Sequence, residues 1–269
     1  MNVISMTASS AVMAGGEGVF TPPNPTDFWQ PLIGSGAWAF TRPMALLLIA
    51  GLFVGGMTLW MSSGAAAVPS RKQYYLELLY NFVRNSIARD MIGGAHFKRF
   101  LPLLFALFTF ILVNNLMGVI PPFQNPPMAR IGFPIALTLV AYIAYHYVGL
   151  KRYGLFGYFK HMIPPGLPLW IAPVIFVLEL ITYFITRPLT LALRLFGNMF
   201  AGHMVLVLFI LGGEFLLFHG EGLLKAAGVA SLGMGVLMTV FELLIQFLQA
   251  YVFTLLTASY IATALADDH

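Results

Sequence analysis

Two long apolar runs constrain the fold of this chain more than any other feature. They cover Leu167–Leu211 and Ala226–Ala266, and each is about twice the roughly 20 residues that one helical membrane span needs. As α-helices they would extend roughly 60 Å or more, against a hydrocarbon core of about 30 Å. Each run therefore either folds into two spans or forms one oblique helix. Because no polar loop interrupts either run, and turns at membrane depth are tolerated only when buried or lining water, the sequence predicts two long, steeply tilted helices.

The composition agrees with a membrane protein. Of the 269 residues, 59% are hydrophobic and only 9% are charged, whereas soluble domains carry about 25% charged residues. Cysteine is absent, which excludes disulfides and cysteine-based metal sites. The net charge of +4 comes from basic residues spread over short loops. Membrane topology explains that pattern better than a nucleic-acid partner does.

The rest of the chain supplies three shorter spans and one amphipathic segment. Between the first and second spans, Leu76, Leu79 and Val83 share one helical face with Tyr80 and Ile87, which predicts a helix lying in the cytoplasmic interface. Its apolar face either anchors it to the membrane or docks a partner. The predicted class is all-α integral membrane, with about five membrane-embedded helices plus this interfacial helix. The predicted organisation is a tail over 1–42, a span over 43–62, the interfacial helix over 71–92, a helical hairpin over 101–150 and a long tilted hairpin over 167–266.

Loop charges predict the orientation. Cytoplasmic loops are enriched in Lys and Arg, and the opposite loops, around Pro121–Arg130 and Gly212–Lys225, contain only Arg130 and Lys225. We therefore expect the N-terminus outside and the C-terminus inside. The cytoplasmic basic residues would be Arg71, Lys72, Arg84, Arg89, Lys98, Arg99, Lys151, Arg152 and Lys160.

Polar side chains inside the long runs are the candidate functional residues. On an ideal helix Arg187 and Asn198 lie within about 20° and 40° of Arg194, whereas His203 faces nearly the opposite side. Intramembrane ionisable groups normally line a bundle interior or a water-filled path. The second run carries its own stripe, and other polar residues lie nearby; these further candidates are Glu242, Gln246, Gln249, Glu179, Asn114 and Asn115.

Structural explanations compete with the ion route at several positions. Arg187 is compatible with a snorkelling or structural charge, and His203 and Glu242 with a simple mutual pair. The two asparagines at 114 and 115 fit interhelical hydrogen bonds as well as channel lining. His146, among tyrosines near a span end, is typical of an aromatic belt. Arg194 is harder to explain structurally, because no carboxylate lies near it in sequence.

Enzyme motifs are missing from the sequence. It contains no HExxH, GxSxG, P-loop or GxGxxG pattern, so no metal, nucleotide or other cofactor is indicated. Transport is the remaining class. A stand-alone channel or secondary transporter would need gating repeats or a second carboxylate pathway, and neither is visible.

Three segments make the transport class specific. "RPLTLALRLFGNMFAGH" and "ELLIQFLQAYVFTLLTASYI" resemble the signature of subunit a of F-type ATP synthases, and "NNLMGVIPPF" resembles that family's motif at the end of its second span. The resemblance extends from about Arg71 to the C-terminus. It implies that Arg194 is the essential stator arginine and that Asn198, His203, Glu242 and Gln249 are the polar positions of the proton half-channels.

The resemblance also implies partners and a location. A ring of c-subunits, peripheral-stalk b-type subunits and the remaining ATP synthase subunits would surround this non-catalytic subunit. We expect a bacterial plasma membrane, with the mitochondrial inner membrane as the alternative. Two departures stand out: the acid and the imidazole are exchanged at His203 and Glu242 relative to some members, and Glu179 stands one place early relative to Arg187.

Overall fold

The computed structural model describes residues 20, 22–24, 31–34, 39–63, 70–120, 124–162, 168 and 170–266. The chain forms two compact units. One combines Met1–Arg42 with Ala201–Leu244, and the other combines Pro43–Phe200 with Ile245–His269. Helices α8 (Arg187–His219) and α9 (Leu223–Leu265) contribute residues to both units. Most of the predicted tail over 1–42 lies outside the described residues.

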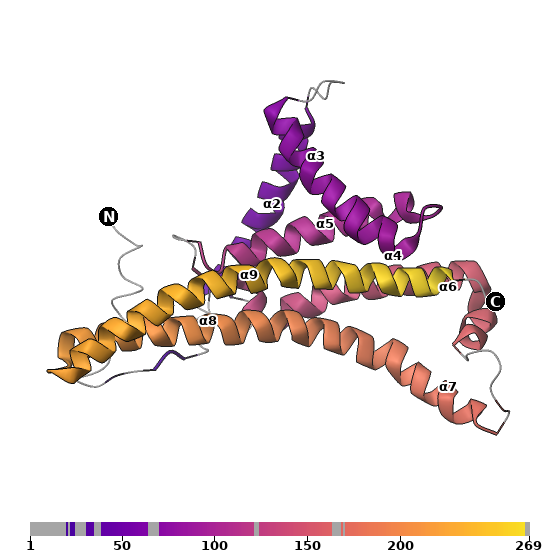
Figure 1. Ribbon diagram of the computed structural model, residues 1–269. Helices are drawn as coiled ribbons and strands as arrows, with labels where there is room; N and C mark the ends of the chain where they lie inside the picture. Colours follow the sequence, from indigo (N-terminus) through magenta and orange to yellow (C-terminus); the bar gives the residue numbers. More distant parts are fainter. Residues whose placement is uncertain are drawn as a thin grey trace. The chain divides into compact units, whose positions relative to one another are not determined.

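Within the described ranges, five helical segments are long and apolar enough to cross a membrane (Figure 1). Three are α2 (Arg42–Ser62), α5 (Phe97–Leu116) and α6 (Gly132–His161). The fourth runs for 48 residues through α7 (Ala172–Ile181), η5 (Thr182–Thr186) and α8, and the fifth is the 43-residue α9. The predicted all-α membrane class, with two long final helices instead of four short spans, is confirmed.

One predicted loop is wrong. The region Gly212–Lys225 was expected to be a loop between the two long helices, yet α8 continues to His219 and the turn needs only residues 220–222. The turn includes Gly222 with a φ of +52°. Gly213, inside the region expected to be a loop, allows close helix packing, because a Cβ on it would lie 2.9 Å from the Leu232 side chain.

The larger unit has one continuous buried core. Helix α5 buries residues three and four apart, as expected for one helix face packed against neighbours, and α8 buries a matching row at four-residue spacing. Lipid is itself apolar, so close van der Waals packing holds these helices together more than the hydrophobic effect does. The central buried residues are Leu104, Phe108 and Ile111 on α5, Leu191, Leu195 and Met199 on α8, and Ala250, Phe253 and Ile261 on α9.

The segment predicted as an interfacial helix is helical throughout. It comprises α3 (Arg71–Val83), the π-helical turn η3 (Arg84–Arg89) and α4 (Asp90–Ile92). Ser70 caps its start by accepting a hydrogen bond from the Gln73 N–H at 3.4 Å, and Gly93 follows it with a φ of +84°. Val83 and Ile87 are fully buried in the core, so one side of this segment packs on protein.

Helix α6 bends sharply near its end. Gly154 has a φ of +67°, a left-handed conformation that glycine adopts without strain. After the bend, Tyr158 returns to hydrogen-bond His146 Nδ1 at 2.7 Å, and its ring lies so close to Gly149 that an added Cβ would meet it at 2.4 Å. The Tyr153 hydroxyl donates to the Ala266 carbonyl beyond α9. His146 is therefore buried in an aromatic cluster and does not belong to an exposed belt.

The smaller unit contains the ends of α8 and α9 that meet at the 220–222 turn. Ser231 donates to the Phe209 carbonyl at 2.8 Å, and a Cβ on Gly228 would lie 2.9 Å from the Leu217 nitrogen. The same unit includes a short antiparallel strand pair, β1 (Pro31–Ile33) with β2 (Phe40–Thr41), which the sequence did not lead us to expect. Its pairs are Pro31 with Thr41 and Ile33 with Phe40.

A 3₁₀ turn, η4 (Pro127–Ala129), precedes α6. Met128 and Ala129 in this turn are buried in the core.

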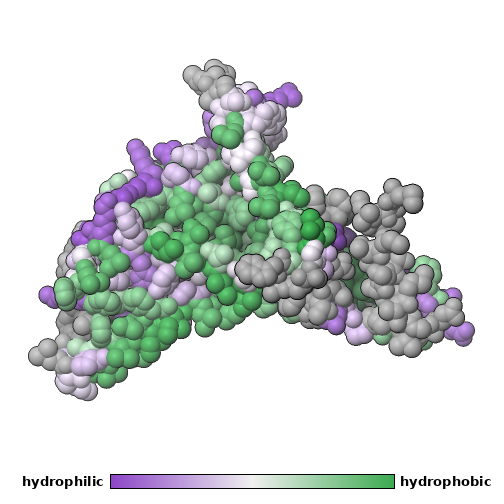
Figure 2. All heavy atoms as spheres, turned by 180° about the vertical axis from the view of Figure 1, so that it is seen from behind, coloured by the Kyte–Doolittle hydropathy of each residue, from purple (hydrophilic) through white to green (hydrophobic). Residues whose placement is uncertain are grey.

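The surface is strongly apolar, as Figure 2 shows, with hydrophobic residues covering much of the face in view. Leu52 on α2 and Val236 on α9 are exposed to 77% and 68%. Exposed apolar area on this scale marks a surface that lipid or other protein covers.

Candidate functional site

Arg194 lies on the exposed side of α8. The opposite side of the same stretch carries the buried row Leu191, Leu195 and Met199, which fixes which way the helix faces. Arg194 is exposed, and so is its neighbour Leu193, at 43%. A guanidinium at the apolar surface of a membrane helix is costly unless something outside the chain interacts with it.

One turn further along α8, an amide pair joins the two long helices. The Asn198 amide donates to Gln249 Oε1 of α9 at 2.7 Å. Gln249 is 3% exposed, whereas Asn198 is exposed. The pair therefore extends from the protein interior to the side of α8 that carries Arg194. These three predicted residues are brought together within the larger unit.

A second polar layer connects α5 with α9. The Asn115 amide donates to the backbone carbonyl of Gln246 at 3.2 Å, and the Asn114 amide donates to the Phe110 carbonyl at 2.8 Å. Both asparagines are fully buried, and Gln246 is 1% exposed. The Gln246 side-chain amide makes no hydrogen bond within the described part of the chain. Asn115 thus has a clear interhelical role, and the Gln246 side chain adds buried polar atoms beside it.

The acid and the imidazole belong to the smaller unit. His203 and Glu242 are 4% and 5% exposed, so both are buried. The Glu242 carboxyl group packs against Gly202, where an added Cβ would meet Oε1 at 3.6 Å. The carboxyl group of α9 is therefore next to the residue that precedes His203 on α8. Glycine at 202 lets the two helices approach closely at this point.

Although Arg187 lies on the same face of α8 as Arg194, it has different surroundings. Its guanidinium carbon is 3.6 Å from the ring centroid of Tyr183 and 4.9 Å from that of Tyr260. These are cation–π contacts. Glu179 is half-buried on α7 and lies outside the hydrogen-bonded set described above.

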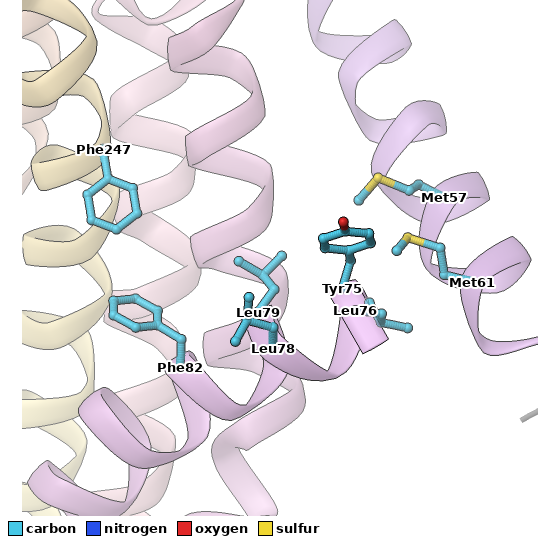
Figure 3. A pocket seen from close by; sticks show the side chains of 8 residues that line it. All are labelled: Met57, Met61, Tyr75, Leu76, Leu78, Leu79, Phe82 and Phe247. Carbon is cyan, nitrogen blue, oxygen red and sulfur yellow. The ribbon is translucent and has the colours of Figure 1, made fainter. Parts of the chain in front are cut away.

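An apolar groove lies on the other side of the larger unit, between α2, α3 and α9. Its volume is about 520 Å³. In Figure 3, Met57 and Met61 of α2 face Tyr75 of α3, while Phe82 and Phe247 stand at the far end. The two phenylalanine rings are 5.9 Å apart. The remaining lining residues are Leu76, Leu78 and Leu79.

The arrangement suits ion movement better than covalent chemistry. Among the described residues, no group of three or more His, Asp or Glu could hold a metal ion. What the two long helices supply is a guanidinium, buried amides, an imidazole and a carboxyl group. Such groups line proton and ion pathways in membrane proteins. The fold and the site therefore define a polytopic α-helical membrane protein with polar groups suited to an ion path.

Comparison with known proteins specifies that class. The family model described as "ATP synthase A chain" matches residues 44–262. ATP synthase subunit a of a Nocardioides species is 42% identical over 98% of this chain and all of that protein. The corresponding subunits of Pseudarthrobacter chlorophenolicus and Rhodococcus erythropolis are 41% and 40% identical, over 96% and 98% of this chain and 98% and 96% of theirs. The chain belongs to the ATP synthase subunit a family, the proton-translocating stator subunits of that complex, and it is a bacterial membrane protein.

The surroundings of Arg187 were not predicted from the sequence. The residues that enclose it, Tyr183 and Tyr260, were not singled out, and Tyr145 was interpreted only as part of an aromatic belt. The available signal was Pro188, which directly follows the arginine. Proline inside a helix removes a backbone donor and disturbs the preceding turn, and a disturbed turn inside a membrane needs side chains to bond its backbone.

Proposed function

We propose that this chain is the non-catalytic stator subunit that provides two aqueous half-channels and presents Arg194 to the carboxylates of a rotating c-subunit ring. One observation carries the proposal. Arg194 is exposed on α8 beside the apolar Leu193, and the nearest acidic residue in sequence, Glu179, lies roughly four helical turns away. A carboxylate on another chain is the natural partner for such a cation.

Coupling follows from electrostatics. A proton entering from outside neutralises a ring carboxylate, and the neutral site can then turn into lipid. After nearly a full turn the proton leaves through the second half-channel. Arg194 attracts the ionised carboxylate and so favours its deprotonated form. Because a guanidinium keeps its own proton, it also blocks a direct leak between the half-channels. The driving term is about 2.3 kcal/mol per charge per 100 mV.

We assign the polar residues to the two sides of this barrier. His203 and Glu242 would form the outer path, because both are ionisable and the Glu242 carboxyl group packs beside the residue before His203. Asn198, Gln246 and Gln249 would hold water without adding charge. Asn114 and Asn115 would complete the lining around Gln246, which accepts a hydrogen bond from Asn115.

The proposed orientation places the N-terminus outside and the C-terminus in the cytoplasm. The chain contains no cysteine, so single cysteines can be introduced without background. Cysteines at Ser70 and at Asp268, which lies outside the described residues, should react with impermeant reagents only from the cytoplasmic side. Labelling of either position from outside would overturn the orientation.

We further propose that a membrane helix of a peripheral-stalk b-type subunit packs in the apolar groove of Figure 3. Met57 and Met61 line it, and flexible thioethers adapt well to an opposing helix. A photoreactive cross-linker on a cysteine at Met57 should capture a b-type subunit in the assembled complex. The matched control is a cysteine at Ile143, which is exposed on α6 away from the groove. Capture of lipid alone from Met57 would exclude this partner.

The decisive experiment removes the guanidinium. In assembled ATP synthase, Arg194→Ala should abolish ATP synthesis and ATP-driven proton pumping while the membrane sector becomes passively leaky. Leu193→Ala is the matched control, since its side chain is the exposed neighbour on the same helix. Near wild-type synthesis by Arg194→Ala vesicles under an imposed proton gradient would refute the proposed function.

A further inference from the structure

The π-helical turn η5 ends two residues before Pro188. It covers Thr182–Thr186, immediately before α8. The Arg187 N–H donates to the Thr182 carbonyl five residues back, which leaves the Tyr183 carbonyl without that donor. The next N–H along the chain would belong to residue 188, and proline has none. The Tyr183 carbonyl therefore cannot be satisfied within its own helix.

A side chain from another helix supplies the missing donor. The Tyr145 hydroxyl of α6 donates to the Tyr183 carbonyl at 2.9 Å. Tyr145 and Tyr183 are 2% and 8% exposed, so the bond is shielded from water. Threonines donate to carbonyls before the turn and at its end: Thr182 donates to the Leu178 carbonyl at 2.9 Å, and Thr190 to the Thr186 carbonyl at 2.7 Å.

The first residue of α8 is held by aromatic rings. The Arg187 guanidinium lies 3.6 Å from the Tyr183 ring centroid and 4.9 Å from that of Tyr260 on α9. Tyr260 and Tyr145 are themselves in edge contact, with centroids 5.7 Å apart. Tyr183 and Tyr260 thus contact the cation directly, and Tyr145 contacts both of these residues. We call Tyr145, Tyr183, Arg187 and Tyr260 the aromatic clamp.

The position of this clamp matters for the face that α8 presents. A π turn contains one extra residue, and each residue corresponds to 100° of rotation about an α-helix axis. The side chains of α8 are therefore rotated about the helix axis relative to those of α7, by an amount that the π turn sets. Arg194 lies about two helical turns after Arg187, and no further break interrupts α8 before it.

We propose that the aromatic clamp sets the rotation of α8 and so positions Arg194 toward its partner carboxylate. This inference rests on the proposed function of Arg194. The four clamp residues touch no proton carrier; they are positioning residues that act through the helix. The clamp stabilises the π turn at the Tyr183 carbonyl, to which Tyr145 donates, and at Arg187, which directly follows the turn; these are the two points from which the turn could otherwise relax.

The test measures the rotation directly. Spin labels on cysteines at Ile143 and Leu193 report the position of α8, and labels at Ile143 and Val177 report that of α7 before the turn; all three side chains are exposed. A rotation by one residue would move a side chain about 5 Å from the helix axis by roughly 8 Å. Tyr145→Phe and Arg187→Ala should shift or broaden the Ile143–Leu193 distance distribution and leave the Ile143–Val177 distribution unchanged.

Activity and controls complete the experiment in the assembled complex. Arg187→Ala should lower ATP synthesis by about tenfold, the scale of a partly buried cation–π contact, and Arg187→Lys should restore most of it. Tyr147→Phe, at an exposed tyrosine of the same helix as Tyr145, should change neither the distances nor the rate.

The outcomes separate two hypotheses. Unchanged distances in both clamp variants would overturn the positioning role, whatever happens to the rate. Retained ATP synthesis in Arg194→Ala would overturn the proposed function, while the distance shift would still test the clamp.

Discussion

Arg187 and Arg194 are seven residues apart on one helix face, yet their environments are opposite. Arg187 is enclosed by the rings of Tyr183 and Tyr260, whereas Arg194 is exposed beside Leu193. The first cation has its partners within the chain and the second has none nearby in sequence. Two arginines at helical spacing can therefore have different roles, one as an internal anchor and the other as an external contact.

The contrast lies in the helix partners of each arginine. Near Arg187, η5 and α9 contribute the tyrosines Tyr183 and Tyr260, whose rings contact the guanidinium. Near Arg194, α9 contributes Gln249, which bonds Asn198 and adds no charge. A cation that is already enclosed gains little from a passing carboxylate, while an exposed cation at an apolar surface gains much. We therefore expect Arg194, and not Arg187, to be the arginine on which activity depends.

The strongest challenge to this comparison is to replace each arginine by lysine. Arg194→Lys should lower ATP synthesis by a factor of about 100 or more, because a lysine in such a site can lose its proton and lacks the planar fork. Arg187→Lys should retain most activity, since an ammonium also binds aromatic faces. Rates of ATP synthesis in membrane vesicles, normalised to assembled complex, provide the measurement. Equal losses in the two variants would remove the distinction between anchor and contact.

The buried acid and imidazole offer a second comparison with the exposed arginine. His203→Ala or Glu242→Ala should each slow proton-driven ATP synthesis by about a hundredfold, the low end for loss of one proton-transfer group. The exchange His203→Glu with Glu242→His should recover part of the rate. Proton uptake by vesicles checks this directly. If the losses simply add in the exchanged variant, the two residues act independently.

A packing change should act on assembly and not on proton transfer. Gly228→Ala would place a methyl group 2.9 Å from the Leu217 nitrogen and 3.0 Å from the Gly213 carbonyl oxygen. Backbone atoms yield little, so we expect a loss of about 1–3 kcal/mol, seen as a lower melting temperature of the purified complex. Gly233→Ala is the control, because no atom lies within 4 Å of its added Cβ. A proton-transfer defect without loss of stability in Gly228→Ala would contradict a packing role.

The smallest effect should come from the amide pair beside Arg194. Asn198→Ala and Gln249→Ala each remove one neutral hydrogen bond of 2.7 Å, which is typically worth about 1 kcal/mol. We expect a reduction in synthesis of about threefold to fivefold for either change. The double variant should be no worse than the single ones. A large additional loss in the double variant would mean that the two amides do not act as a unit.

The sequence predicted the helices better than the contacts. Uninterrupted apolar runs specify two long helices because a bilayer permits no unsatisfied backbone within it. The predicted apolar run ended at Leu211, yet α8 continues to His219. Gly213 lies within that helix and packs against the Leu232 side chain, which is 19 residues away on another helix, beyond what local pattern can show.

The candidate site was predictable where chemistry alone sufficed. A charged residue such as Arg194 or Glu242 inside an apolar run is a candidate functional residue, because placing a charge in the membrane costs free energy. The Tyr145 hydroxyl could not be assigned in that way, because its partner is the Tyr183 backbone carbonyl. That carbonyl lacks a donor within its own helix only because of the π turn. A tyrosine near a span end fits several roles equally well.

The bend at Gly154 restricts how the length of this chain can change. The left-handed glycine, the approach of the Tyr158 ring to Gly149 and the bond from Tyr153 to the Ala266 carbonyl must all occur together. One residue inserted between Gly149 and Tyr158 would rotate the tyrosine by about 100° and remove it from His146. Insertions and deletions should therefore be excluded from this ten-residue stretch, so variation in length has to be absorbed by other connections.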